Sequence, residues 1–112
     1  MTVSERSSGA VTVLDVNGAL TLTDGADQLR DKVRSLLQQG HKRLLIDLSG
    51  VPYIDSAGLG ELVQSYATAS KQDGQLKILN AGKRIKDLLV ITKLATVFEL
   101  FDNEAAAVTS FT

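Results

Sequence analysis

A serine and an aspartate stand side by side in the stretch YIDSAGLGEL, residues 53–62, where an apolar run gives way to a helical pattern. Ser56 is predicted at or next to the amino-terminal cap of that helix, where backbone N–H groups lack partners and the helix dipole favours an anion. Gly58 and Gly60 keep the first turn free of side-chain bulk, so another molecule can approach the backbone closely. The residue types indicate a hydroxyl at the positive end of a helix, on a surface that another molecule can reach. A simple cap with two packing glycines explains them equally well.

An enzyme with Ser56 as its nucleophile is the alternative of another class, and it needs a general base. The only histidine, His41, lies in GHKR between a predicted helix and a strand, which is typical of a solvated residue. Ile54 replaces the first glycine of a hydrolase elbow, and Val63 replaces the third glycine of a dinucleotide motif. Without cysteine or a ligand cluster, thiol chemistry and a metal site are not expected. We expect no catalytic residue, cofactor or metal.

The bulk composition narrows the class of partner. The chain of 112 residues has a formal net charge of −1, so it lacks the basic excess of a nucleic-acid binder. It contains no apolar run of membrane-spanning length, and its first residues lack the apolar core of a signal peptide. Its hydrophobic content of 44% is ordinary for a globular protein, and its length fits one domain over residues 1–112. We expect a cytoplasmic protein that binds neither nucleic acid nor membrane.

The elements that position the motif are predicted from apolar periodicity. Strands are predicted at Val3–Arg6, Val11–Val16, Arg43–Leu48, Gln75–Leu79 and Thr96–Phe101. Helices are predicted from Asp24 to Gly40 and at Ser56–Asp73, Lys83–Lys93 and Asn103–Ser110. Asp24 is predicted to cap the first helix, with Asp27 at the capping-box position. The order β-β-α-β-α-β-α-β-α predicts an α/β fold with a mixed, mostly parallel sheet of four to five strands and about four helices, opened by an antiparallel hairpin.

The chain around this motif resembles one known family. The string DSAGLG, Asp55 to Gly60, resembles the phosphorylation-site motif of the STAS domain, the fold of bacterial anti-sigma factor antagonists. The similarity covers nearly the whole chain, through IDLSGVPYIDSAGLGELV, NGALTLTDGADQLR, LKILN and KLATVFELFDNEAAAV. The resemblance implies that Ser56 is phosphorylated by a partner kinase. Ala57 stands where the family often has a second hydroxyl, so Ser56 is the only acceptor in the motif.

The resemblance also implies a function in transcription regulation and stress response. The unmodified protein binds an anti-sigma factor that is also a serine kinase, and so frees a sigma factor; phosphorylation of Ser56 loosens the complex, and a serine phosphatase restores it. The implied partner-binding residues are Thr23, Asp24, Asp55, Ser56, Ala57, Gly58, Leu59 and Gly60. Thr23 is also typical of a cap, and Leu59 falls on the apolar stripe of its helix. An accessory or scaffold STAS protein in a signalling or transport complex is the alternative.

A phosphoaspartate receiver domain is the nearest rival fold by size and strand order. Asp47 lies in the third predicted strand, where its acceptor would be sought. A receiver also needs an acidic pair after the first strand and a late Lys-Pro, whereas the only proline here is Pro52. The receiver pattern is therefore missing.

Overall fold

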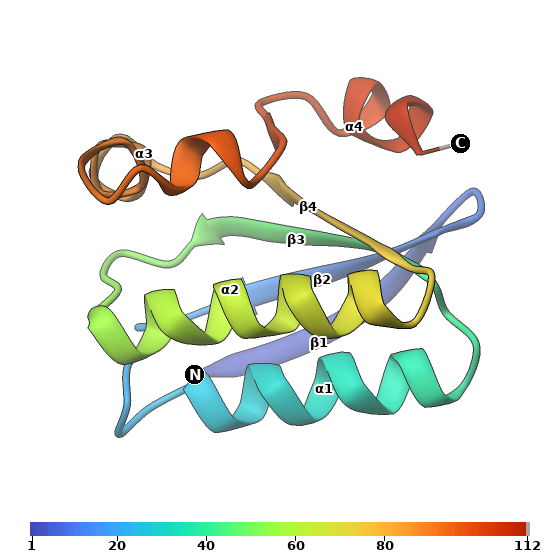
Figure 1. Cartoon of the computed structure of the whole chain (residues 1–112), viewed down its shortest axis with the longest axis horizontal. Coiled ribbons are helices and arrows are strands. Elements are labelled where there is room, and N and C mark those ends of the chain that lie inside the picture. Colours follow the sequence, from blue (N-terminus) through green and yellow to red (C-terminus); the bar gives the residue numbers. More distant parts are fainter. Residues whose placement is uncertain (112) are drawn as a thin grey trace.

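Five strands form one sheet in the computed structural model, which describes residues 1–111 (Figure 1). The strands are β1 (Thr2–Ser8), β2 (Val11–Asn17), β3 (Arg43–Gly50), β4 (Gln75–Leu79) and β5 (Leu100–Phe101). They lie side by side in the order β1-β2-β3-β4-β5. β1 and β2 pair antiparallel, and the other neighbours pair in parallel. The predicted mixed sheet and its opening hairpin are confirmed.

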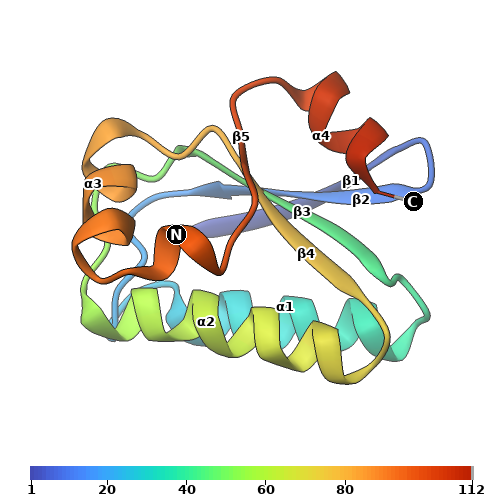
Figure 2. The ribbon, with the colours of Figure 1, turned by 45° about the horizontal axis from the view of Figure 1, so that its top comes forward.

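One helix follows each of the strands β2 to β5 along the chain, in the predicted order. They are α1 (Ala26–Gln38), α2 (Ser56–Lys71), α3 (Lys83–Ile91) and α4 (Glu104–Ser110), with a 3₁₀ turn η1 (Leu94–Thr96). α1 and α2 cover one face of the sheet and α4 covers the other, as Figures 1 and 2 show. α3 lies at the end of the sheet where β3 leads into α2 (Figure 1). The start of α2 therefore lies at the carboxyl ends of the parallel strands.

Successive side chains of β3 point to opposite faces of the sheet, and its apolar side chains contribute to a core on each face. Leu44, Ile46 and Leu48 belong to the main core under α1 and α2. Leu45 points the other way and joins a smaller core with Ala107 of α4. All four β3 side chains are at most 1% exposed. The continuous apolar run RLLIDL is thus explained by a strand that is covered on both sides.

The strand predicted at Thr96–Phe101 is wrong over most of its length. Its first part lies in η1, and only Leu100–Phe101 pairs with β4. Lys93 has φ of 63°, in the left-handed region, which turns the chain before η1. Phe98 is then buried edge-to-face against Tyr66 of α2, with ring centroids 5.4 Å apart. The apolar residues of this segment serve packing against a helix rather than sheet pairing.

The prediction that Asp24 caps the first helix is also wrong. Gly25 holds the position before α1 with φ of 101°, a conformation that favours glycine, and no side chain caps this helix. The preceding residues close a tight turn in which the Thr21 N–H donates to the Asp24 carbonyl at 2.7 Å. The Asp24 carboxylate lies 3.3 Å from the amino group of Met1. Asp27 forms no capping box, and its carboxylate pairs with Arg30 at 2.9 Å.

Candidate functional site

The hydroxyl of Ser56 is exposed at the first residue of α2. The cap of this helix is its neighbour Asp55, which has extended backbone angles and whose Oδ1 accepts a hydrogen bond from the Gly58 N–H at 2.8 Å. Within residues 1–111 the Ser56 hydroxyl makes no hydrogen bond to another residue. Because Asp55 caps the helix, Ser56 is not needed for that purpose. Its hydroxyl is therefore free to receive another group.

Asp55 also joins two segments that are far apart in the sequence. Its Oδ2 accepts a hydrogen bond from the Leu22 N–H at 3.1 Å, and its own N–H donates to the Leu20 carbonyl at 3.3 Å. The N–H groups of Gly58 and Leu22, in that order of importance, hold the pKa of the Asp55 carboxyl below its ordinary value. The carboxylate is therefore ionised at neutral pH. A fixed negative charge lies beside the Ser56 hydroxyl.

The two glycines of the motif have different surroundings. A Cβ on Gly58 would collide with the carbonyl oxygen of Leu20, so this position admits only glycine while the two segments stay in contact. A Cβ on Gly60 would meet no atom within 4 Å. We expected both glycines to let another molecule approach the backbone. At Gly58 the approaching group is the chain's own Leu20, and only Gly60 leaves an open surface.

The predicted site residues come from two segments that the structure brings together. A parallel bridge between Leu20 and Ile54 lies beside them. Four of the predicted residues are exposed: Thr23, Asp24, Ser56 and Gly60. Asp55 and Ala57 are partly buried, and the buried pair is Gly58 and Leu59. Leu59 is 8% exposed and belongs to the main core, so it positions the helix rather than offering a contact surface.

Two exposed apolar side chains flank this site and were not among the predicted residues. Leu22 is 70% exposed and Tyr53 is 55% exposed. The Leu22 backbone bonds to Asp55, and Tyr53 lies three residues before Ser56. A large apolar residue in a short connection, next to a polar motif, is the sequence signal that identifies such positions. They add apolar contact area to an otherwise small and polar surface.

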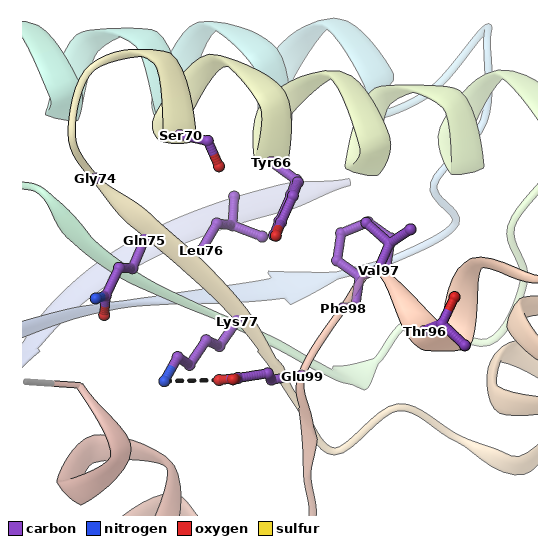
Figure 3. A pocket seen from close by; sticks show the side chains of 10 residues that line it. All are labelled: Tyr66, Ser70, Gly74, Gln75, Leu76, Lys77, Thr96, Val97, Phe98 and Glu99. Carbon is purple, nitrogen blue, oxygen red and sulfur yellow. Dashed lines mark ion pairs between the residues drawn. The ribbon is translucent and has the colours of Figure 1, made fainter.

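A hollow lies between β4 and the segment from η1 to β5, away from Ser56, and its volume is about 320 Å³ (Figure 3). Its lining residues are Tyr66, Ser70, Gly74, Gln75, Leu76, Lys77, Thr96, Val97, Phe98 and Glu99. Lys77 Nζ lies 2.7 Å from a Glu99 carboxylate oxygen, and the same ammonium donates to Ser110 Oγ at 2.9 Å. The Lys77 ammonium is thus held between Glu99 and the end of α4.

Other kinds of site find little support in the described part of the chain. Residues 1–111 contain no group of three His, Asp or Glu side chains that could hold a metal ion. None of the helices among these residues is long and apolar enough to cross a bilayer. His41 is exposed, with Nδ1 3.4 Å from Thr12 Oγ1. Asp47 is 9% exposed, and its Oδ1 accepts from the Ser49 N–H at 2.9 Å.

Comparisons with known proteins show the family and the fold of this chain. A family model described as "STAS domain" matches residues 3–107. The anti-sigma-B factor antagonist of Bacillus subtilis is 39% identical over 75 residues, which cover 67% of this chain and 68% of that protein. An anti-sigma factor antagonist from Mycobacterium paratuberculosis superposes with a TM-score of 0.85 at 24% identity, covering 97% of this chain and 92% of that one.

The structure of a third similar protein is that of a phosphorylated form. The Bacillus cell fate determinant SpoIIAA in its phosphorylated form superposes with a TM-score of 0.76 at 16% identity. The match covers 99% of this chain and 100% of that one. At this identity the likeness concerns the fold. The other two similar proteins are both named as antagonists of an anti-sigma factor.

Proposed function

We propose that this chain, which belongs to the STAS domain family, is an anti-sigma factor antagonist controlled by phosphorylation of Ser56. Its unmodified form binds an anti-sigma factor that is also a serine kinase, and the bound anti-sigma factor releases its sigma factor. The kinase then phosphorylates Ser56, and a serine phosphatase reverses the modification. This function belongs in the cytoplasm, where sigma factors act. The chain itself is a ligand and a phosphoacceptor, not a catalyst.

The observation that carries this proposal is the exposed Ser56 hydroxyl, which has no structural task of its own. In the transfer, Ser56 Oγ attacks the γ-phosphorus of ATP held by the kinase, and the bond to ADP breaks. The hydroxyl proton goes to a base on the kinase, since no base is hydrogen-bonded to Ser56 in the described residues. Because Asp55 holds the start of α2, the hydroxyl stays accessible without local unfolding.

A phosphate at Ser56 is expected to act on the partner rather than on the fold. It adds roughly −1.5 to −2 charges at neutral pH. The Gly58 N–H is already bound to Asp55, so the phosphate is not drawn into the first turn and stays at the surface. One unit-charge repulsion across an interface, at ~7 Å and an effective dielectric of ~20, costs about 2.4 kcal/mol. That energy corresponds to more than a tenfold loss of affinity, since ~1.4 kcal/mol is a factor of ten.

The test is a titration of the purified chain with each kinase-type anti-sigma factor encoded in its genome of origin. We expect one of them to bind the wild type and Ser56→Ala, and to bind Ser56→Asp more than about tenfold more weakly. Ser70→Asp is the matched control, because Ser70 is also an exposed serine of α2 but lies near its other end. With ATP, mass spectrometry should find one phosphate on the wild type and none on Ser56→Ala.

Two results would contradict the proposal. If Ser56→Asp bound as tightly as the wild type, phosphorylation would not control the complex. If no anti-sigma factor bound the wild type, the accessory or scaffold alternative would replace it. Circular dichroism of Ser56→Asp should match the wild type, which separates lost binding from lost folding.

A further inference from the structure

A small hollow lies between the connection from β3 to α2 and the helix α3. Its volume is about 190 Å³, and its lining residues are Pro52, Tyr53, Ile54, Arg84, Ile85 and Leu88. Pockets for drug-sized molecules usually have about 300–1,000 Å³. This hollow is smaller, and all but one of its side chains are mainly apolar. Its size and lining suit a single apolar side chain from another protein better than a small metabolite.

Arg84 supplies the one charged group of the hollow. Its side chain is exposed, and it forms no ion pair or side-chain hydrogen bond with any residue from 1 to 111. A guanidinium at the edge of an apolar hollow pairs best with a carboxylate, which it can bind through two parallel N–H donors. The hollow therefore favours an apolar side chain with an acidic residue beside it.

One face of α3 continues from this hollow along the helix. Arg84, Leu88 and Ile91 are spaced i, i+4 and i+7, which places them on one face of the helix. Ile91 is 78% exposed, although it is large and apolar. Figure 1 places α3 next to the connection that leads into α2, so α3 and the start of α2, where Ser56 is the first residue, lie at the same end of the sheet.

We infer that the hollow and the α3 face form a second part of the docking surface, and that they receive an apolar side chain and a neighbouring carboxylate of the anti-sigma factor. This inference rests on the proposed function. Two features support that occupant: the charge of Arg84 complements a carboxylate, and Tyr53 makes the hollow continuous with the Ser56 segment. The surface recognises the partner through groups that phosphorylation does not alter. Recognition and switching are thus carried by different residues.

The first experiment reverses the charge of Arg84. The probe is the anti-sigma factor that binds the wild type in the titration described above. We expect Arg84→Glu to weaken binding by at least about tenfold, and Tyr53→Ala to weaken it as well. Arg43→Glu is the matched control, because Arg43 is an exposed arginine at the amino-terminal end of β3, at the other end of the sheet. Melting curves of all variants establish that they are folded.

The second experiment uses the absence of cysteine from the chain. Ile91→Cys provides a single thiol for a benzophenone label, and Thr109→Cys provides the control on α4, which lies away from α3 in Figures 1 and 2. We expect light to crosslink the Ile91 label, but not the Thr109 label, to the anti-sigma factor. A partner variant with the contacting carboxylate changed to arginine should restore binding to Arg84→Glu.

The outcomes separate this inference from the proposed function. If Arg84→Glu and Arg43→Glu both bind like the wild type, and Ile91 does not crosslink, the α3 face is not part of the interface. In that case loss of binding in Ser56→Asp would still support the proposed function. If the wild type binds no anti-sigma factor, the proposed function fails and this inference fails with it.

Discussion

Adding one methyl group at Gly60 should make the protein more stable and its complex weaker. Gly60 is exposed, lies in the interior of α2 and has empty space where a Cβ would stand. It follows Ser56 by four residues, so the new methyl group would lie one turn away on the same face, at about 5–6 Å between Cβ atoms. Gly60→Ala therefore changes the proposed docking surface without touching the core.

The expected stability gain follows from helix propensity. Alanine is favoured over glycine inside a helix by about 1 kcal/mol. The unfolding entropy of about 2.1 cal/mol/K per residue gives ~0.24 kcal/mol/K for a chain of this length, so the melting temperature should rise by about 4 °C. A methyl group in a close-packed interface typically costs about 1–3 kcal/mol. The affinity for the anti-sigma factor should therefore fall by roughly tenfold.

The assay pairs thermal melting with the binding titration, and Gly58→Ala is the control. That substitution has the same propensity gain, but its Cβ would collide with the Leu20 carbonyl, so it should lower the melting temperature. Equal binding of Gly60→Ala and the wild type would refute the view that this helix face meets the partner. A lower melting temperature for Gly60→Ala would refute the open space that we describe.

Three further predictions concern single side chains. Asp55→Ala should lower the melting temperature, because two backbone N–H groups lose their acceptor; the difference should be complete above about pH 4, the ordinary pKa of an aspartate, and should shrink as pH falls from there through the lower pKa of the folded carboxyl. Burial raises the pKa of Glu61, so Glu61→Gln, which keeps an acceptor for Ser65, should be more stable than the wild type at pH 7 and equally stable near pH ~4 in urea titrations. Lys77→Met should lower the free energy of unfolding by about 2–3 kcal/mol and speed hydrogen exchange in α4 alone, because the Ser110 carbonyl and hydroxyl oxygens lose the ammonium that donates to them; uniform acceleration across the chain would contradict this.

The sequence predicts the parts of the fold that depend on regular apolar spacing. The run RLLIDL and the stripe of α2 place β3 and the start of the helix, and with them Ser56, at the correct edge of the sheet. The failures occur where one long-range contact decides the local structure. Phe98 packs against Tyr66 of α2 and does not pair at the sheet edge. Strand propensity, which depends on the local sequence, does not predict a contact with a residue of a distant helix.

The candidate site shows the same division. The types of Asp55 and Ser56 and their place before a helix predict both residues as part of the site. The sequence does not show why position 58 must be glycine, because the Leu20 carbonyl that a Cβ would meet there lies 38 positions earlier in the chain. Asp24 has the residue type of a cap, yet the glycine that follows it adopts the conformation that starts the helix. Tyr53 carries a sequence signal, a large apolar residue in a short connection beside the polar motif, but the exposed fraction of 55% comes from the structure.

Because the Asp55 side chain, and not that of Ser56, caps the beginning of α2, position 56 can be varied chemically while the start of the helix is kept. A cysteine at this position would be the only thiol of the molecule, and an environment-sensitive dye attached to it would report partner association directly. Non-hydrolysable phosphonate side chains could be installed in the same place by expanded-code translation. Because the side chain at position 56 does not cap the helix, the protein is a convenient scaffold for a biosensor.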